Sequence, residues 1–155
     1  MQQTNDSKIR KATQQDLLDL SILSKQFSRE AKQNGYNLTF DTTKFTDSFS
    51  KVIDNPDYFY YIAEVNGEAV GFFLGAVFRP LFSEDILAVE MFWWLEKEYR
   101  GNKVALKMLK SFEAWAKEAG ASEVSVSDLQ GLKNLDSLYG RLGYTRSEVT
   151  YKKDL

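Results

Sequence analysis

One segment in the middle of the chain combines basic residues with a glycine where a strand is expected to give way to a helix. It reads Trp93-Trp94-Leu95-Glu96-Lys97-Glu98-Tyr99-Arg100-Gly101-Asn102-Lys103-Val104-Ala105. Small or flexible residues at such a turn let backbone N–H groups point at one spot, where the helix dipole adds partial positive charge. The segment therefore predicts an anion-binding site.

The local charge favours the same interpretation, because it opposes the charge of the whole chain, which is −2 over 155 residues. From Leu95 to Lys110, two acidic residues stand against five basic ones, which are Lys97, Arg100, Lys103, Lys107 and Lys110. A solvated basic helix face after an ordinary turn would give the same pattern, because one glycine and a few lysines are a weak signal. The residues alone leave both interpretations open.

The segment also resembles the loop that binds the acyl-CoA pyrophosphate in the GNAT superfamily of N-acetyltransferases. The family pattern is Arg or Gln, two residues, Gly, one residue, and then Gly or Ala. Arg100 and Ala105 match its ends and Gly101 matches a glycine common at that place, whereas Lys103 replaces the middle glycine. This lysine either pairs with phosphate or crowds the loop.

A second segment, farther along the chain, resembles another motif of the same family. Its sequence, Leu138-Tyr139-Gly140-Arg141-Leu142-Gly143-Tyr144, is similar to the family's Leu-Tyr-x-x-Leu-Gly-Phe. The similarity extends over nearly the whole chain from Lys8. The stretch from Ser111 to Lys117 further resembles small single-domain members of phage or bacterial type.

The resemblance implies transfer of an acetyl group from acetyl-CoA to a primary amine by direct attack, without a metal. The amine must lose a proton, the thioester oxygen must be stabilised, and the departing thiolate must be protonated. The family places a backbone donor and the pantetheine arm along the central strand, here near Trp93, Trp94 and Leu95. The expected contacts to the rest of the cofactor are Arg100, Gly101, Asn102, Lys103, Val104 and Ala105.

Two residues are candidates for proton transfer. Glu90 is the candidate base, because it is the only ionisable residue of an apolar strand and burial would raise its pKa. Glu90 could instead form a structural ion pair or face solvent, and a water chain could then act as the base. Tyr139 is the candidate acid, the role that the resemblance gives it, because the pKa of a phenol (~10) is close to that of a thiol (~8.5). Its alternative is a core aromatic residue.

The remaining expectations concern ligand contacts. The family often has an Asn seven residues before that tyrosine, where this chain has Leu132; Asn134 either acts in a shifted register or caps the helix. Glu84 and Asp85 could serve as a base or bind a cationic acceptor. The acceptor pocket is expected between Phe27 and Phe45 and over 79–85, while Tyr58–Tyr61 line it or pack in the core.

Composition excludes several kinds of site. The chain has no Cys and no His, which removes Ser-His-Asp and Cys-His catalysis, disulfides, and zinc sites made of imidazole or thiolate. The net charge gives no basic field for nucleic acid, and no apolar run reaches the ~20 residues of a membrane span. We expect a cytoplasmic protein with no nucleic-acid or membrane partner, and leave a homodimer open.

The elements that must position these residues follow from apolar periodicity. Strands are expected over 8–12, 58–65, 68–78, 86–95, 123–127 and 145–152, and helices over 14–29, 43–53, 102–118 and 135–142. Asn66-Gly67 predicts a hairpin turn, and the strand over 86–95, apolar on both faces, is expected to be central. The order β-α-α-β-β-β-α-β-α-β predicts a mixed α/β fold of the GNAT type, with an antiparallel N-terminal half and helices on both faces. We expect a single domain over 8–155, preceded by a flexible N-terminal segment over 1–7.

A second function remains open on the same residues. A catalytically silent GNAT-like module would bind CoA, or a protein partner, without turnover. Lys103 and the displaced Asn favour this alternative.

Overall fold

A single five-stranded sheet, with its strands in the order β1-β2-β3-β4-β5, organises the chain. The computed structural model describes residues 6–128 and 135–155. The first four strands pair antiparallel, and β5 pairs parallel with β4. The strands are β1 (Ser7–Lys11), β2 (Tyr58–Val65), β3 (Glu68–Phe78), β4 (Leu87–Leu95) and β5 (Glu123–Ser125). The predicted mixed sheet with an antiparallel first half is confirmed.

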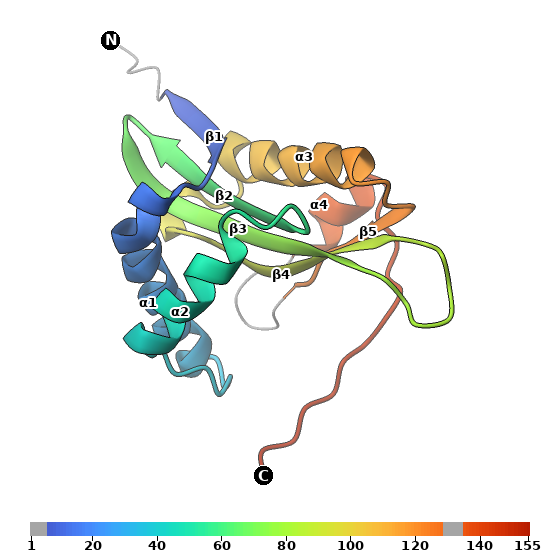
Figure 1. Cartoon of the computed structure of the whole chain (residues 1–155), viewed down its shortest axis with the longest axis horizontal. Coiled ribbons are helices and arrows are strands. Elements are labelled where there is room, and N and C mark those ends of the chain that lie inside the picture. Colours follow the sequence, from blue (N-terminus) through green and yellow to red (C-terminus); the bar gives the residue numbers. More distant parts are fainter. Residues whose placement is uncertain (1–5, 129–134) are drawn as a thin grey trace.

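Helices cover both faces of this sheet, as the sequence predicts (Figure 1). They are α1 (Leu17–Gln33), α2 (Thr42–Val52), α3 (Lys103–Glu118) and α4 (Asp136–Arg141), with short 3-10 turns at Gln14–Asp16 and Lys97–Tyr99. The first helix is longer than predicted, because it continues past Arg29 and ends only before Gly35, whose φ of +85° breaks helical geometry. The last helix is shorter than predicted.

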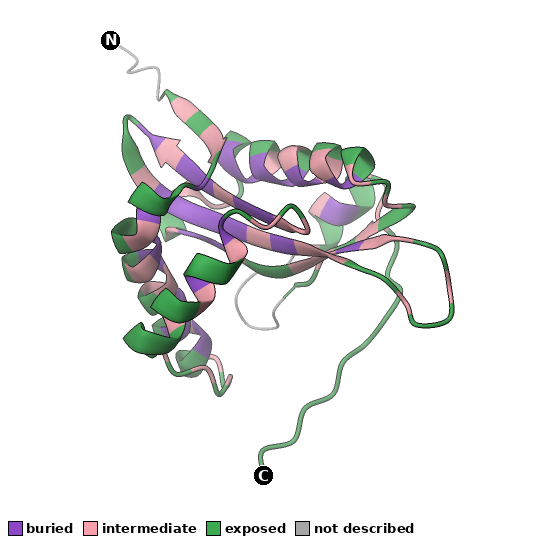
Figure 2. Ribbon diagram, in the orientation of Figure 1, coloured by how far each residue is buried: buried purple, intermediate pink, exposed green. Residues whose placement is uncertain are grey.

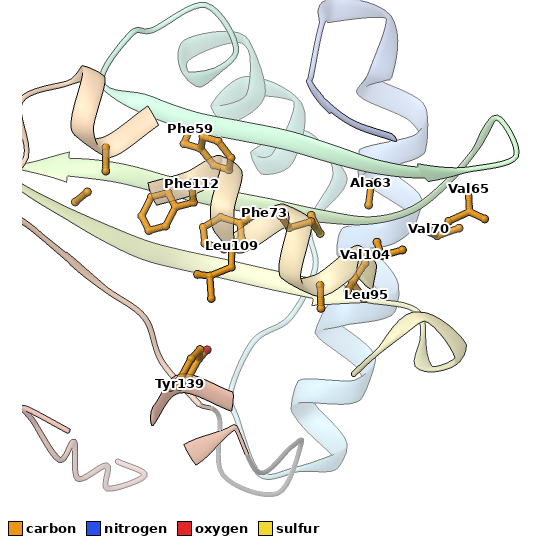
Figure 3. Close-up of a cluster of buried hydrophobic side chains, with 14 residues drawn as sticks. Phe59, Ala63, Val65, Val70, Phe73, Leu95, Val104, Leu109, Phe112 and Tyr139 are labelled. Carbon is orange, nitrogen blue, oxygen red and sulfur yellow. The ribbon is translucent and has the colours of Figure 1, made fainter. Parts of the chain in front are cut away.

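Two separate hydrophobic clusters lie on the two sides of the sheet (Figure 2). One packs α3 and Tyr139 of α4 against the sheet, and Figure 3 shows Phe59, Phe73, Leu109 and Phe112 in this layer. The other packs α1 and α2 against the opposite face. Strand residues alternate between the two clusters because successive side chains point to opposite faces.

Two glycine-dependent features shape the central hairpin. Asn66 and Gly67 have φ of +52° and +82°, the two positive values that a type I′ turn needs, so the predicted hairpin is confirmed. In β3, a Cβ on Gly75 would lie 2.5 Å from the Phe112 ring of α3. The absence of a side chain at Gly75 therefore lets α3 pack directly on the strand.

The predicted last strand over 145–152 is wrong. These residues form neither strand nor helix and are exposed, and the tail runs away from the sheet (Figure 1). Only Val149 and Tyr151 are apolar in this stretch, and they are 66% and 91% exposed, so the segment buries too little apolar area to be held as a strand. Its end contacts the loop after α1 instead, where Asn37 Nδ2 donates to Asp154 Oδ1 at 2.9 Å.

Candidate active site

The candidate site begins where β4 and β5 separate. The two strands pair at only three positions, of which Val89 opposite Ser125 is the last. Strand β4 continues to Leu95, so within the described residues its backbone edge beyond Glu90 has no neighbouring strand on the β5 side. An edge of this kind presents N–H and C=O groups that a ligand can pair with.

An irregularity in β4 lies at the same place. Phe92 pairs with Leu74 and Glu90 pairs with Gly75, which leaves Met91 as an extra residue in β4, the arrangement of a β-bulge. Bulges bend a strand and change the direction of its side chains, and they are common beside active sites. After this one, Trp94 packs in the α1–α2 cluster, whereas Trp93 and Leu95 pack in the α3 cluster.

The two candidate proton-transfer residues both form hydrogen bonds with Ser127, which lies two residues after the end of β5. The carboxylate Oε2 of Glu90 accepts hydrogen bonds from the backbone N–H of Ser127 at 2.9 Å and from its hydroxyl at 2.7 Å. The hydroxyl of Tyr139 donates to the backbone oxygen of Ser127 at 2.9 Å. Ser127 therefore joins β4 to α4 across the gap. Glu90 is half-buried, less enclosed than its apolar strand suggests.

Tyr139 is almost completely buried, at 9% exposure, and its ring centroid lies 5.5 Å from that of Tyr144. Burial raises the pKa of its phenol well above the usual value, and the negative charges of Glu90 and Asp128 raise it further. The hydroxyl therefore keeps its proton throughout the neutral range, which is the form that a proton donor needs.

The loop before α3 offers backbone donors in an open setting. Gly101 has φ of +72°, and a Cβ there would meet no atom within 4 Å. The first N–H groups of a helix have no acceptor within the helix; the side chain of Asn102 caps one of them, Val104 N–H, at 2.9 Å. Lys103, the first residue of α3, is exposed. This donor set, with a cationic side chain at its edge, suits a diphosphate.

Arg100 is placed differently from what a phosphate contact would require. Its guanidinium donates to both carboxylate oxygens of Glu30 in α1, at 2.7 and 2.6 Å, and to the backbone oxygen of Leu95 at 2.7 Å. It also lies 5.7 Å from the ring centroid of Trp94. The side chain therefore holds the loop in place, and the backbone N–H of Arg100 donates to the Lys97 oxygen at 3.3 Å.

The other predicted cofactor contacts are also mostly buried. The side chains of Trp94, Leu95, Val104 and Ala105 are in the core, so a ligand could contact these residues only through backbone groups, and Val104 N–H is already capped by Asn102. Trp93 is half-buried and lines a cavity. Asn134 lies outside the described residues. Sequence reasoning missed Ser127, although it ends the strand predicted over 123–127, and parallel strands place their carboxyl ends at one edge.

Two cavities open beside the separating strands. The smaller, of about 240 Å³, contains Glu90, Trp93, Ser127 and Asp128 among its lining residues. The larger, of about 450 Å³, lies between α1, α2 and the sheet. Residues of the predicted acceptor segment 27–45 line both cavities, whereas none of 79–85 is among the lining residues.

The described residues lack a metal-binding cluster and a membrane-spanning helix. They contain no group of three or more carboxylate, imidazole or thiol side chains placed to hold a metal ion. Among their helices, none combines the length and the apolar character of a membrane span.

Solved structures with this fold cover almost the whole chain. A transcriptional regulator from Bacillus halodurans C-125 superposes with a TM-score of 0.77 at 18% identity, over 97% of this chain and 100% of the other. The aminoglycoside N-acetyltransferase AAC(6')-Iy, in complex with CoA, superposes with a TM-score of 0.77 at 15% sequence identity, over 100% of this chain and 99% of the other. A predicted acetyltransferase from Clostridium acetobutylicum, with acetyl-CoA, superposes with a TM-score of 0.74 at 20% sequence identity, over 96% of each chain. At these identities the likeness shows the fold.

A family model provides the evidence for membership. A search of curated proteins finds no match. The model described as the acetyltransferase (GNAT) family matches residues 21–144, which include most of α1, the separating strands, the loop before α3 and Tyr139. The resemblance seen in the sequence is confirmed. The chain belongs to the acetyltransferase (GNAT) family.

Proposed function

We propose that this protein transfers the acetyl group of acetyl-CoA to a primary amine by direct attack on the thioester. The observation that carries the proposal is the meeting of Glu90 and Tyr139 at Ser127, where β4 and β5 separate. A proton acceptor and a proton donor on separate elements thus lie beside one open strand edge.

The residues that would hold acetyl-CoA lie along this edge and at the start of α3. Backbone N–H groups near Gly101, Asn102 and Lys103 would bind the pyrophosphate, with the ammonium group of Lys103 as a counter-charge. The edge of β4 from Trp93 to Leu95, which has no neighbouring strand on the β5 side within the described residues, would lie along the amide groups of the pantetheine arm. When bound, acetyl-CoA supplies an activated acetyl group.

Each proton has an assigned place. The carboxylate of Glu90 takes a proton from the attacking ammonium, directly or through one water, and the nitrogen then bonds the acetyl carbon. Backbone N–H groups of β4 stabilise negative charge on the thioester oxygen. As the carbon–sulfur bond breaks, Tyr139 gives its proton to sulfur. The nitrogen loses its second proton as the carbon–sulfur bond breaks, and this proton restores the phenol of Tyr139, directly or through water. The proton held by Glu90 passes to solvent, and the products are the N-acetyl amine and the free thiol of CoA.

One observation favours the second candidate, a module that binds CoA without turnover. The proton of Tyr139 is already donated to the backbone oxygen of Ser127, and its raised pKa makes it a weaker acid than a free phenol. In this alternative the tyrosine fixes α4 to the end of β5.

Acetyl-CoA binding and turnover test the proposal separately. Thermal melts and calorimetry with acetyl-CoA measure binding, and at about a hundred times Kd the ligand adds about 2.7 kcal/mol of stability. Release of free CoA thiol over a panel of amines measures turnover, without background because the protein has no Cys. Binding without turnover of any amine would establish the silent module, and no binding would overturn both functions.

A further inference from the structure

The two cavities beside the active site adjoin each other. Three residues, Phe27, Leu38 and Phe92, line both of them. The rings of Phe27 and Phe92 meet edge to face, with centroids 5.6 Å apart, so this aromatic pair stands at the boundary. A molecule that enters the smaller cavity can therefore extend along the pair into the larger one.

The smaller cavity has an acidic end. Glu90 and Asp128 line it, and both are used as hydrogen-bond acceptors, by Ser127 and by the backbone N–H of Leu135 respectively. A single ammonium group fits here, because the carboxylates supply the counter-charge that a partly desolvated cation needs.

The larger cavity is apolar. Six of its lining residues are Phe40, Phe45, Phe49, Val52, Phe72 and Leu74. Several of its polar groups are already satisfied within the protein: Ser28 donates to the Leu38 oxygen at 2.6 Å, and Asp41 caps α2 by accepting from Lys44 N–H at 2.7 Å. Among the described residues that line it, the charged ones are Asp41 and Lys44, which have opposite signs.

Building on the proposed function, we propose that the acceptor is a monoamine with an apolar tail, aliphatic or aromatic. Its ammonium group lies beside Glu90, and its tail passes Phe27 and Phe92 into the larger cavity. A polycationic acceptor such as an aminoglycoside or a polyamine is disfavoured. It would bring further charges into the larger cavity, where Asp41 is the one carboxylate among the described lining residues and already caps α2.

The tail length of the amine tests this inference through turnover. Across ethylamine, butylamine, hexylamine and phenethylamine, we expect kcat/KM to rise about fourfold for each methylene group buried. Spermidine and sisomicin are expected to be poor acceptors. A flat series, or faster acetylation of spermidine or sisomicin than of hexylamine, would overturn the inference and leave the acetyltransferase proposal standing.

A cavity-filling variant tests where the tail lies. Ser48 lines the larger cavity from α2, and Ser48→Trp would fill that space with an indole ring. The ratio of kcat/KM for hexylamine over ethylamine should then fall toward one. Thr43→Trp, on the exposed surface of the same helix, is the matched control and should keep the wild-type ratio. An unchanged ratio in Ser48→Trp would place the tail elsewhere.

Direct binding keeps the inference testable if the protein turns over no amine. Calorimetry then measures hexylamine binding to the protein saturated with acetyl-CoA, in wild type, Ser48→Trp and Thr43→Trp. Hexylamine binding that only Ser48→Trp weakens would support the cavity assignment while the proposed function fails. Absence of hexylamine binding would overturn the assignment on its own.

Discussion

The guanidinium of Arg100 donates hydrogen bonds to both carboxylate oxygens of Glu30, at 2.7 and 2.6 Å. Each of the two side chains is only 14% exposed. The pair ties the loop before α3 to α1, two elements that belong to opposite faces of the sheet. Trp94 Nε1 donates to the same carboxylate at 2.9 Å. The loop before α3, where we propose that the diphosphate binds, is thus held in place by a residue of α1, a helix that borders the proposed acceptor cavity.

The first prediction concerns this ion pair. Hydrogen bonds from Arg100 hold the pKa of Glu30 below its usual range, so the pair stabilises the fold above the unfolded pKa of ~4.3 and loses that effect as pH falls below it. Glu30→Gln should lower the free energy of unfolding by about 1–3 kcal/mol near neutral pH, and by less at about pH 3. Urea denaturation measures both values. Glu98→Gln, exposed on the same loop, is the control; an equal loss at both pH values would contradict the ion-pair assignment.

The second prediction separates ligand binding from backbone strain at Gly101. Gly101→Ala should weaken acetyl-CoA binding, because the loop would leave the positive φ that aims its N–H groups. Gly120→Ala, at the other end of α3 with φ of +82°, imposes a similar strain away from the loop. Both variants should lose about 1 kcal/mol of stability. Calorimetry should show weaker acetyl-CoA binding only for Gly101→Ala; equal affinities would move the phosphate site elsewhere.

The third prediction concerns Lys103, the departure from the family pattern. Because this lysine is exposed at the first turn of α3, we expect it to contact phosphate rather than crowd the loop. Lys103→Ala should raise Kd for acetyl-CoA by about fivefold, and the affinity should depend less on salt. Lys110→Ala, exposed farther along the helix, should change neither. Tighter binding by Lys103→Ala would identify the lysine as an obstruction.

The fourth prediction addresses Glu90 as a base. Glu90→Gln keeps the shape of the side chain and can still accept the hydrogen bonds of Ser127, but it cannot take a proton. We expect kcat/KM to fall by about 10²–10⁴ near neutral pH. We also expect the wild-type rate to fall toward acid pH, and Glu90→Gln should lack this acid limb. Glu84→Gln, exposed in the β3–β4 loop, serves as the control. If the variant keeps the wild-type rate and acid limb, a water chain or another group is the base.

The fifth prediction uses Tyr139→Phe. Acetyl-CoA affinity should stay within a few-fold, while turnover falls by about 10²–10⁴ if the phenol protonates the thiolate. Wild-type stability should also decline above about pH 10, because the raised folded pKa lets only the unfolded tyrosine ionise there. Tyr139→Phe should show less of this alkaline decline, measured by urea denaturation. The comparison is Tyr144→Phe, which removes a neighbouring phenol that donates to Glu113. Unchanged turnover in Tyr139→Phe would show that Tyr139 is a packing residue.

The sequence predicts those parts of the molecule that depend on local rules. The hairpin at Asn66-Gly67 follows from its turn geometry, and β4 follows from an apolar run that only Glu90 interrupts. The strand over 145–152 fails because alternation alone does not supply buried area. The hydrogen bonds that join Glu90 and Tyr139 through Ser127 arise from the separation of β4 and β5, which depends on strand pairing that no local pattern reports.

The two hydrophobic clusters on opposite sides of the sheet also bear on how the protein can change over generations. Side chains in the α1–α2 cluster border the larger cavity, whereas the α3 cluster includes Val104 and Ala105 at the start of α3, where we propose that the diphosphate binds. Because the sheet separates the two clusters, a substitution in one does not directly repack the other, and the ion pair of Glu30 and Arg100 links the two sides. On the proposed assignment, a lineage could acquire a new acceptor without rebuilding its acetyl donor site.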